Sequence, residues 1–218
     1  MKQEINLMEK YPVTKRDLSK RSEERSEEDI KIARKFDKDF FDGDRRHGYG
    51  GFNYNPKYWT DVVEVFKNHY NLNKNSRVLD VGCAKGFMVY DMSLCLQNNL
   101  VYGIDISEYA IKNCKPEVSD NLFVGEAHEI AFPDKFFDLS ISINTVHNYD
   151  IFGVKKCLNE LNRVSKNSFI TVDAYSNEQE KKNMFDWNLT ALTILHKQEW
   201  IELFNKENYQ GDYHWFTP

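Results

Sequence analysis

The stretch Arg77-Val-Leu-Asp-Val-Gly-Cys-Ala-Lys-Gly86 decides the fold of this chain. Its first half is an apolar run typical of a buried strand, interrupted by an acid and followed by a glycine-bearing turn. Phe87 to Leu96 then carry apolar side chains at helical spacing. Glycines let a backbone approach a ligand closely, and the free amides of a helix N-terminus face that ligand. The strand, turn and helix therefore predict a nucleotide-cofactor cradle in an α/β fold.

A second apolar run that ends in an acid supports this interpretation. The run Leu100-Val-Tyr-Gly-Ile-Asp105 places Asp105 where a carboxylate can bind two ribose hydroxyls. A dinucleotide site has the spacing Gly-x-Gly-x-x-Gly, which the first turn lacks. Asp80 and Asp105 would repel a pyrophosphate, but they suit a cofactor that carries an ammonium and a sulfonium group.

These residues resemble the first motif of class I S-adenosylmethionine-dependent methyltransferases, acid-x-Gly-x-Gly-x-Gly. Asp80, Gly82 and Gly86 match that motif, and Ala84 replaces its middle glycine. Alanine adds one methyl group, which narrows the allowed backbone angles without necessarily blocking the ligand. The resemblance implies an α/β, Rossmann-like doubly wound sheet that is mostly parallel, with an antiparallel C-terminal strand.

Later signals follow the same family order over roughly residues 77 to 175. Gly125-Glu-Ala127 follows an apolar run, and a Pro-Asp turn precedes Phe137-Asp-Leu139. The resemblance implies S-adenosyl-L-methionine as cofactor, with Glu126 at the adenine amino group. The residues implied to bind the cofactor are Asp80, Gly82, Cys83, Ala84, Gly86, Asp105, Ile106, Glu126, Ala127 and Asn144.

Composition limits the class of protein. The 218 residues fit one domain with an appendage, and no apolar run has transmembrane length. A net charge of -5 gives no global attraction to nucleic acid. The polar start of the chain shows no signal peptide, and the four scattered cysteines indicate reduced thiols. We therefore expect a cytoplasmic protein without a metal, since no histidine pair has ligand spacing.

Residues 1–55 are predicted to form a helical arm and lid loop, and residues 56–218 the methyltransferase domain. Ser26-Glu-Glu-Asp29 is a capping-box pattern that predicts a helix from Glu27 to Phe40. This arm is either solvated, or it packs over the cofactor cleft or a partner subunit.

The connector Phe41–Pro56 is rich in glycines, arginines and aromatic residues. One interpretation is an anchored loop whose arginines pair with Asp42 and Asp44. We favour a substrate-facing lid, in which paired arginines bind a phosphate or carboxylate and a tyrosine closes over the methionine end of the cofactor. The predicted acceptor-binding residues are Arg45, Arg46, His47, Tyr49, Tyr54 and Tyr175.

Catalytic candidates follow the fourth and fifth strands, where parallel sheets bind ligands. Methyl transfer from a sulfonium needs alignment, and a hydroxyl or ammonium acceptor also needs a base. His147 is the predicted base because imidazole titrates near neutral pH. Asp173 is predicted to orient the acceptor or His147. Alternatively, His147 hydrogen-bonds in the core and Asp173 caps a helix, while His214 belongs to packing or to the last strand.

Four segments together look like the small methyltransferases of bacterial capsule and surface-polysaccharide biosynthesis. They are Asp44–Phe52, Asp80–Gly86, Ile143–Asn148 and Val172–Tyr175. This resemblance implies O-methylation of a small, anionic acceptor, such as a sugar nucleotide or a phosphate or phosphoramidate precursor. A protein or small-amine methyltransferase and a non-catalytic cofactor-binding subunit stay open as alternatives. The C-terminal aromatic residues are predicted to pack in the core or in a homodimer.

Overall fold

The computed structural model describes residues 3–13, 25–50 and 52–218. Its helices are α2 (Glu27–Ala33), α3 (Lys38–Asp42), η1 (Arg45–His47), α4 (Thr60–His69), α5 (Phe87–Leu96), α6 (Glu108–Lys112), η2 (Pro116–Asn121), η3 (Val146–Asn148), α7 (Ile151–Val164), α8 (Glu178–Trp187) and α9 (Lys197–Lys206). Its strands are β1 (Val78–Val81), β2 (Val101–Asp105), β3 (Leu122–Val124), β4 (Phe137–Ile143), β5 (Ser165–Tyr175), β6 (Leu195–His196) and β7 (Asp212–Phe216).

Within the described ranges, the strands form one seven-stranded sheet in the order β3-β2-β1-β4-β5-β6, with β7 also paired to β5. All residues of β1 are buried, as expected of a central strand covered on both faces. Val78 lies opposite Val101 of β2 on one side and Leu139 of β4 on the other, both in parallel register. The chain order reverses between β1 and β4, and such a switch point opens a crevice at the carboxyl ends of the strands.

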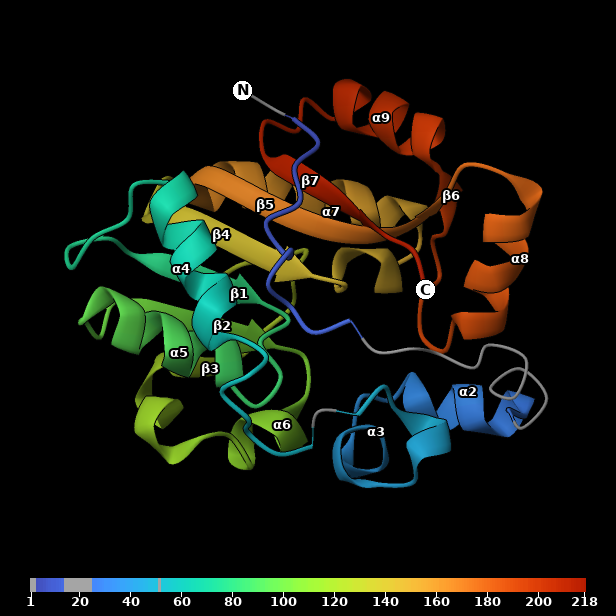
Figure 1. Cartoon of the computed structure of the whole chain (residues 1–218), viewed down its shortest axis with the longest axis horizontal. Coiled ribbons are helices and arrows are strands. Elements are labelled where there is room, and N and C mark those ends of the chain that lie inside the picture. Colours follow the sequence, from blue (N-terminus) through green and yellow to red (C-terminus); the bar gives the residue numbers. More distant parts are fainter. Residues whose placement is uncertain (1–2, 14–24, 51) are drawn as a thin grey trace.

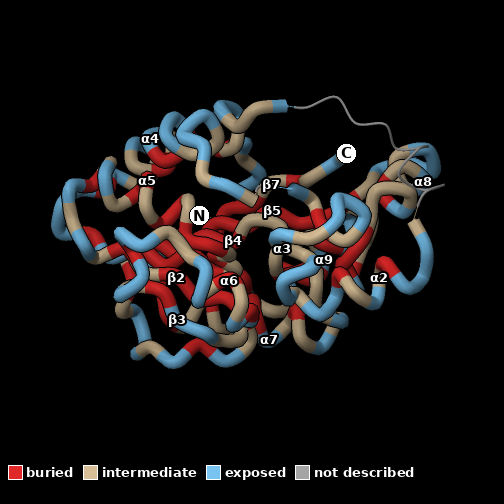
Figure 2. Tube along the Cα trace, turned by 90° about the horizontal axis from the view of Figure 1, so that it is seen from below, coloured by how far each residue is buried: buried red, intermediate tan, exposed pale blue. Residues whose placement is uncertain are grey.

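Helices cover both faces of the sheet (Figure 1). One buried cluster includes Phe66 of α4, Met92 of α5 and Phe169 of β5. The other joins the opposite face to α7 and α9, with Leu158 and Trp200 fully buried. Buried residues follow the strands through the middle of the molecule, and exposed residues lie on the outer helices and the loops (Figure 2). The predicted doubly wound α/β fold is confirmed.

The predicted antiparallel C-terminal strand is wrong. β7 runs parallel to β5, with Phe169 opposite Asp212 and Asp173 opposite Phe216. The cause is α9, which connects β6 to β7. A helical crossover returns the chain to the same end of the sheet, whereas an antiparallel pair needs only a short hairpin. As a result, the carboxyl end of β7 lies at the same edge as those of β1, β2 and β4.

The predicted helix from Glu27 to Phe40 is broken into α2 and α3. Its start is confirmed, because Ser26 and Asp29 form the reciprocal capping box. The break lies at Phe36, whose φ of 49° is left-handed. Asp37 then caps α3 by accepting a hydrogen bond from the amide of Lys38, and such a residue favours a new helix start over continuation.

The first described segment, residues 3–13, lies along the open edge of β7. The amide of Ile5 donates to the carbonyl of Tyr213 across 2.9 Å, and the amide of Tyr213 donates to the carbonyl of Gln3 across 3.0 Å. Leu7 is buried against the α4 and α5 side of the sheet. The segment then passes in front of the sheet toward the arm (Figure 1), so the N-terminal part of the chain approaches the carboxyl edge.

Candidate active site

The glycine-bearing turn between β1 and α5 has three residues with positive φ: Gly82 at 86°, Ala84 at 50° and Gly86 at 76°. A Cβ on Gly82 would lie 2.0 Å from Oγ1 of Thr145, so no larger residue fits there. Ala84 adopts a left-handed conformation that glycine takes more easily. The family's middle glycine is therefore replaced by a residue that keeps the turn's backbone conformation at a modest cost.

Asp105 is held rigidly at the end of β2. Its Oδ2 accepts from the amide of Ala84 at 2.8 Å, and its Oδ1 accepts from the amide of Ser107 at 2.9 Å. Burial raises the pKa of Asp105, while these two hydrogen bonds act in the opposite direction. Each carboxylate oxygen can accept more than one hydrogen bond, so both stay able to bind vicinal hydroxyls.

Asp80 lies beside it in β1 and is 5% exposed. Burial, and then the nearby Asp105, raise the pKa of Asp80 well above its usual value. Within the described ranges, no group hydrogen-bonds to its carboxylate. A cation placed here would offset both effects and restore the charged form. The pair therefore fits a ligand with a ribose and, near it, a positively charged end.

A cavity of about 1210 Å³ opens above these carboxylates. Its walls come from the glycine turn, the carboxyl edges of β4, β5 and β7, residues of the arm and the segment 3–13. Small-molecule sites in proteins have volumes of about 300–1,000 Å³. This cavity is therefore large enough for a cofactor and a second small molecule together.

Most of the predicted cofactor residues line this cavity: Asp80, Gly82, Cys83, Ala84, Asp105, Ile106, Ala127 and Asn144. Gly86 lies behind it as the N-cap of α5, where a Cβ would lie 2.5 Å from Leu122. The carboxylate of Glu126 is not part of the lining; it accepts a hydrogen bond from Tyr149 at 2.8 Å. An adenine contact by Glu126 stays a prediction.

His147 lines the cavity from η3 but is only 4% exposed. Its Nδ1 accepts a hydrogen bond from the amide of Asp173 at 2.9 Å, and burial lowers the pKa of His147 to about 3. The neutral ring then carries its single proton on Nε2, and its one lone pair is occupied. This geometry disagrees with the predicted role of His147 as general base, because no free nitrogen is left to accept a proton.

Asp173 and its neighbours form the rest of the carboxyl edge. Asp173 is 4% exposed and lines the cavity, with Oδ1 3.6 Å from Nδ1 of His147. Asn144, with a φ of 53°, is held by Thr171, whose Oγ1 donates to Asn144 Oδ1 at 2.7 Å and accepts from its amide at 2.9 Å. These polar groups lie on the β4 and β5 side of the two cofactor carboxylates.

Two of the six predicted acceptor residues line the cavity, Arg45 and Tyr49. The Tyr49 hydroxyl accepts from the amide of Leu189 at 2.8 Å, and its ring lies 5.4 Å from that of Trp187. Within the described ranges, no carboxylate pairs with Arg45.

The other four lie outside the lining and have partners elsewhere. Arg46 lies 3.1 Å from Asp44, and His47 lies 2.9 Å from Asp29, as an anchored loop requires.

The two remaining tyrosines are also engaged elsewhere. Tyr54 donates to the buried Asp91 at 2.6 Å, and burial, followed by this hydrogen bond, raises the pKa of Tyr54 to about 12. The Tyr175 ring packs 5.6 Å from that of His196. Each interpretation of the connector therefore holds for some of its residues: Arg46 and His47 anchor the loop, whereas Arg45 and Tyr49 line the cavity.

With this geometry established, comparison with known sequences is decisive. The profile of a family described as "Methyltransferase domain" matches residues 72–211, well over half of the chain. The chain belongs to this methyltransferase family. It is a class I S-adenosylmethionine-dependent methyltransferase.

Solved structures show the same fold. YcgJ of Bacillus subtilis aligns with a TM-score of 0.53 over 66% of each chain, at 20% identity. An S-adenosylmethionine-dependent methyltransferase of Archaeoglobus fulgidus aligns with a TM-score of 0.52 over 71% of each chain, at 22% identity.

Curated relatives match in part. WbdD of Escherichia coli, described as an O-antigen chain terminator bifunctional methyltransferase/kinase, is 31% identical over 107 residues, 44% of this methyltransferase and 15% of WbdD. The uncharacterized protein MJ1252 of Methanocaldococcus jannaschii is 34% identical over 100 residues, 46% of this chain and 37% of its own. This methyltransferase therefore spans less than two fifths of the length of these relatives.

Several cavity residues of this methyltransferase were not expected from the sequence. They are Tyr11 from the first segment, Arg34 and Lys35 from the arm, Trp187 at the end of α8, and His214 and Phe216 from β7. No local pattern marks them, because the chain brings them to the cavity from distant segments. In the described part of the chain no helix is long and apolar enough to cross a bilayer, and no cluster of three metal-ligating side chains occurs.

Proposed function

We propose that the protein transfers the methyl group of S-adenosyl-L-methionine to an oxygen of a small, anionic acceptor. Acceptors of this class include sugar nucleotides and the phosphate or phosphoramidate precursors of a surface polysaccharide. The observation that carries the proposal is Arg45, a guanidinium that lines the cavity and has no carboxylate partner among the described residues.

The carboxylates of β1 and β2 hold the cofactor. Asp105 binds the ribose hydroxyls, and Asp80 faces the positively charged methionine end, where its own buried charge is stabilised. The bound cofactor supplies an electrophilic methyl group. The glycine turn lets the backbone come close to it, and the carboxyl edge of β4 and β5 forms the side from which an acceptor approaches.

Three cations in the described part of the arm line the cavity, Arg34, Lys35 and Arg45, and we assign the acceptor to the space beside them. Arg34 makes one long hydrogen bond, 3.4 Å to the carbonyl of Ala191. A phosphate or carboxylate between these cations would accept charge-assisted hydrogen bonds, which are stronger than hydrogen bonds between neutral groups. The arm would then fix the acceptor and help to exclude water from the site.

Alignment is the main requirement of an in-line displacement, and fixed geometry supplies most of its rate gain. Asp173 is buried at the acceptor edge and orients the acceptor's hydroxyl groups. His147 acts as a positioning residue, since its Nδ1 holds the Asp173 amide. The partial match to WbdD, whose description names an O-antigen, favours a polysaccharide precursor over a protein side chain or an amine.

The test begins with calorimetric titration by S-adenosylmethionine and S-adenosylhomocysteine. Transfer of a labelled methyl group is then measured to glucose 1-phosphate and UDP-glucose, with glucose as the neutral counterpart. Arg45→Gln should raise KM for the phosphorylated acceptors at least about tenfold, a loss of about 1.4 kcal/mol. Arg46→Gln is the matched control, because Arg46 lies outside the cavity lining and pairs with Asp44, and it should change KM less than about twofold.

Three results would contradict the proposal. If the wild-type protein binds no cofactor, the proposed enzymatic activity is wrong and a non-catalytic subunit remains. Transfer to a peptide or an amine in preference to phosphorylated sugars would replace the acceptor class. Equal effects of Arg45→Gln and Arg46→Gln would remove the assigned anion site.

A further inference from the structure

The acceptor's proton has no obvious destination once the ring of His147 is excluded. His147 presents no free lone pair, as described above. A second histidine lines the same cavity, His214 of β7. It reaches the site only because β7 runs parallel to β5 and so ends at the ligand-binding edge of the sheet.

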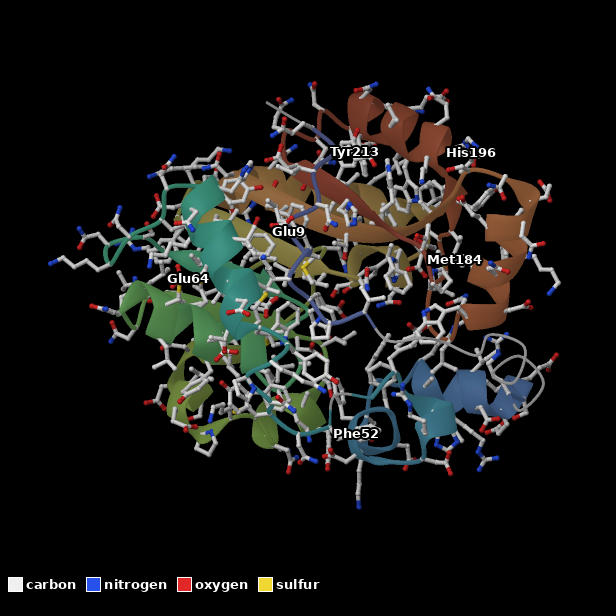
Figure 3. All side chains as sticks on the ribbon, viewed as in Figure 1. Glu9, Phe52, Glu64, Met184, His196 and Tyr213 are labelled. Carbon is white, nitrogen blue, oxygen red and sulfur yellow. The ribbon has the colours of Figure 1, made fainter. Side chains whose placement is uncertain are left out.

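The register of the sheet places His214 beside other residues that line the cavity. His214 lies opposite Thr171 of β5, and Thr171 in turn holds Asn144. Side chains alternate along a strand, so paired residues of neighbouring parallel strands share a face. Tyr213 packs beneath α9, with its ring 5.1 Å from that of Phe204 (Figure 3), which leaves His214 on the opposite face with Thr171.

The ring of His214 also differs from that of His147 in its contacts. It is half-buried, and within the described ranges no hydrogen bond occupies either of its nitrogens. β4 and β7 are separated by β5 alone, so about 10 Å lies between them. The cavity spans this distance at the carboxyl ends of the strands, because Asn144 after β4 and His214 of β7 both line it.

We infer that His214 is the general base that accepts the proton of the acceptor's hydroxyl group. This inference rests on the proposed function. As the acceptor oxygen bonds to the methyl carbon, the carbon–sulfur bond breaks and its electron pair stays on sulfur. The hydroxyl proton passes to a ring nitrogen of His214, and the imidazolium later releases it to water. General-base assistance of this kind contributes about 10²–10⁴-fold to a rate.

Burial favours the neutral form of the His214 ring, and the charged groups around the ring act in both directions. Burial lowers the pKa of His214 most; Glu4 of the first segment raises it, and Lys197 at the start of α9 lowers it. Asp173 lies two residues further along the neighbouring strand, and Asp212 two residues earlier on β7. Asp212 is engaged by His69 and Tyr70 of the α4 end, away from the cavity.

The first test needs no acceptor. Ring resonances are titrated by NMR in complexes with S-adenosylmethionine and with S-adenosylhomocysteine, which lacks the sulfonium charge. His214, assigned from its absence in His214→Gln, should show a pKa lower by about one unit in the sulfonium complex, because a like charge nearby disfavours protonation. His69, which contacts the other end of β7, is the internal control, and its ring resonances should coincide in the two complexes. Equal values for His214 in the two complexes would overturn the inference.

The second test is kinetic, with glucose 1-phosphate and UDP-glucose as acceptors. His214→Gln should lower kcat at least about 100-fold, abolish the rise of kcat with pH and leave cofactor affinity within about twofold. His69→Gln should keep wild-type kcat, and added imidazole should partly restore His214→Gly. A wild-type pH profile in His214→Gln would overturn the inference. Failure of the wild-type protein to methylate either acceptor counts against the proposed function instead, and the NMR titration still decides the role of His214.

Discussion

Nζ of Lys85 lies 2.5 Å from Oδ1 and 2.6 Å from Oδ2 of Asp42, and this contact ties the glycine turn to the arm. Lys85 also donates to the carbonyl of Phe52 at 3.1 Å, on the connector beside α3 (Figure 3), and Tyr109 donates to Asp42 at 2.8 Å. These partners hold the pKa of Asp42 below its usual value despite its partial burial. Lys85, which lies between Ala84 and Gly86, therefore joins the glycine-bearing turn to the arm.

Asp42→Asn should loosen this connection between the turn and the arm. The substitution leaves the Lys85 ammonium, 7% exposed, without its counter-charge, which is costly for a buried cation. We expect S-adenosylhomocysteine to dissociate about tenfold faster, as measured by stopped-flow fluorescence. Asp44→Asn is the matched control, since Asp44 pairs only with the exposed Arg46 among the described carboxylate contacts, and it should leave dissociation unchanged. Equal rates in wild type and Asp42→Asn would show that the contact is structural only.

Asp105→Ala should weaken cofactor binding by about 3 kcal/mol, because two ribose hydrogen bonds to a charged group are lost. The same change frees the amides of Ala84 and Ser107, which disturbs the turn itself. Calorimetry with adenosine separates the two effects, since adenosine carries the ribose but no methionine end. Comparable losses for adenosine and for S-adenosylmethionine would confirm a ribose contact. A loss limited to S-adenosylmethionine would place Asp105 at the methionine end.

The parts of this site that local sequence determines were predictable. The turn from Asp80 to Gly86 and the strand that ends at Asp105 each carry their pattern within ten residues, and both are found as expected. The capping box of Ser26 and Asp29 is equally local. In each case the residues that decide the structure are neighbours in the chain.

Features that depend on distant partners were not predictable in this way. The direction of β7 depends on the crossover through α9, and the amide of Asp173 decides that His147 keeps no free nitrogen to accept a proton. Arg45 and Arg46 are adjacent and chemically identical, yet only Arg45 lines the cavity, because Asp44 holds the other. Sequence indicated the chemistry of the connector, whereas tertiary packing decided which side chain can perform it.

Gly82→Ala should destabilise the protein strongly, whereas Ala84→Gly should change its stability little. Gly82→Ala places a Cβ 2.0 Å from Oγ1 of Thr145 at a φ of 86°, so it should cost more than about 3 kcal/mol of unfolding free energy and abolish cofactor binding. Ala84→Gly relieves a left-handed alanine but gives the unfolded chain more freedom, so the two effects nearly cancel and stability should stay within about 1 kcal/mol. Urea unfolding of both variants provides the measurement. A strongly destabilised Ala84→Gly would show that the methyl group packs in the native turn.

The buried ring of His147 should make the protein sensitive to acid. Its pKa is about 3 when folded, against 6.5 when unfolded, so between these values the unfolded state binds more protons. Stability must therefore rise with pH through this window and be lost on acidification, by about 2 kcal/mol from this group between pH 7 and pH 5. The His147→Gln variant should lose about that much less stability over the same interval, although it starts less stable.

The pH dependence contributed by Asp80 has the opposite sign. The pKa of Asp80 is raised in the folded protein, so the wild-type protein gains stability from this group as pH falls, and Asp80→Asn removes that gain. Urea unfolding at both pH values measures the two differences, and parallel curves for wild type and His147→Gln would show that the ring is already charged in the folded protein.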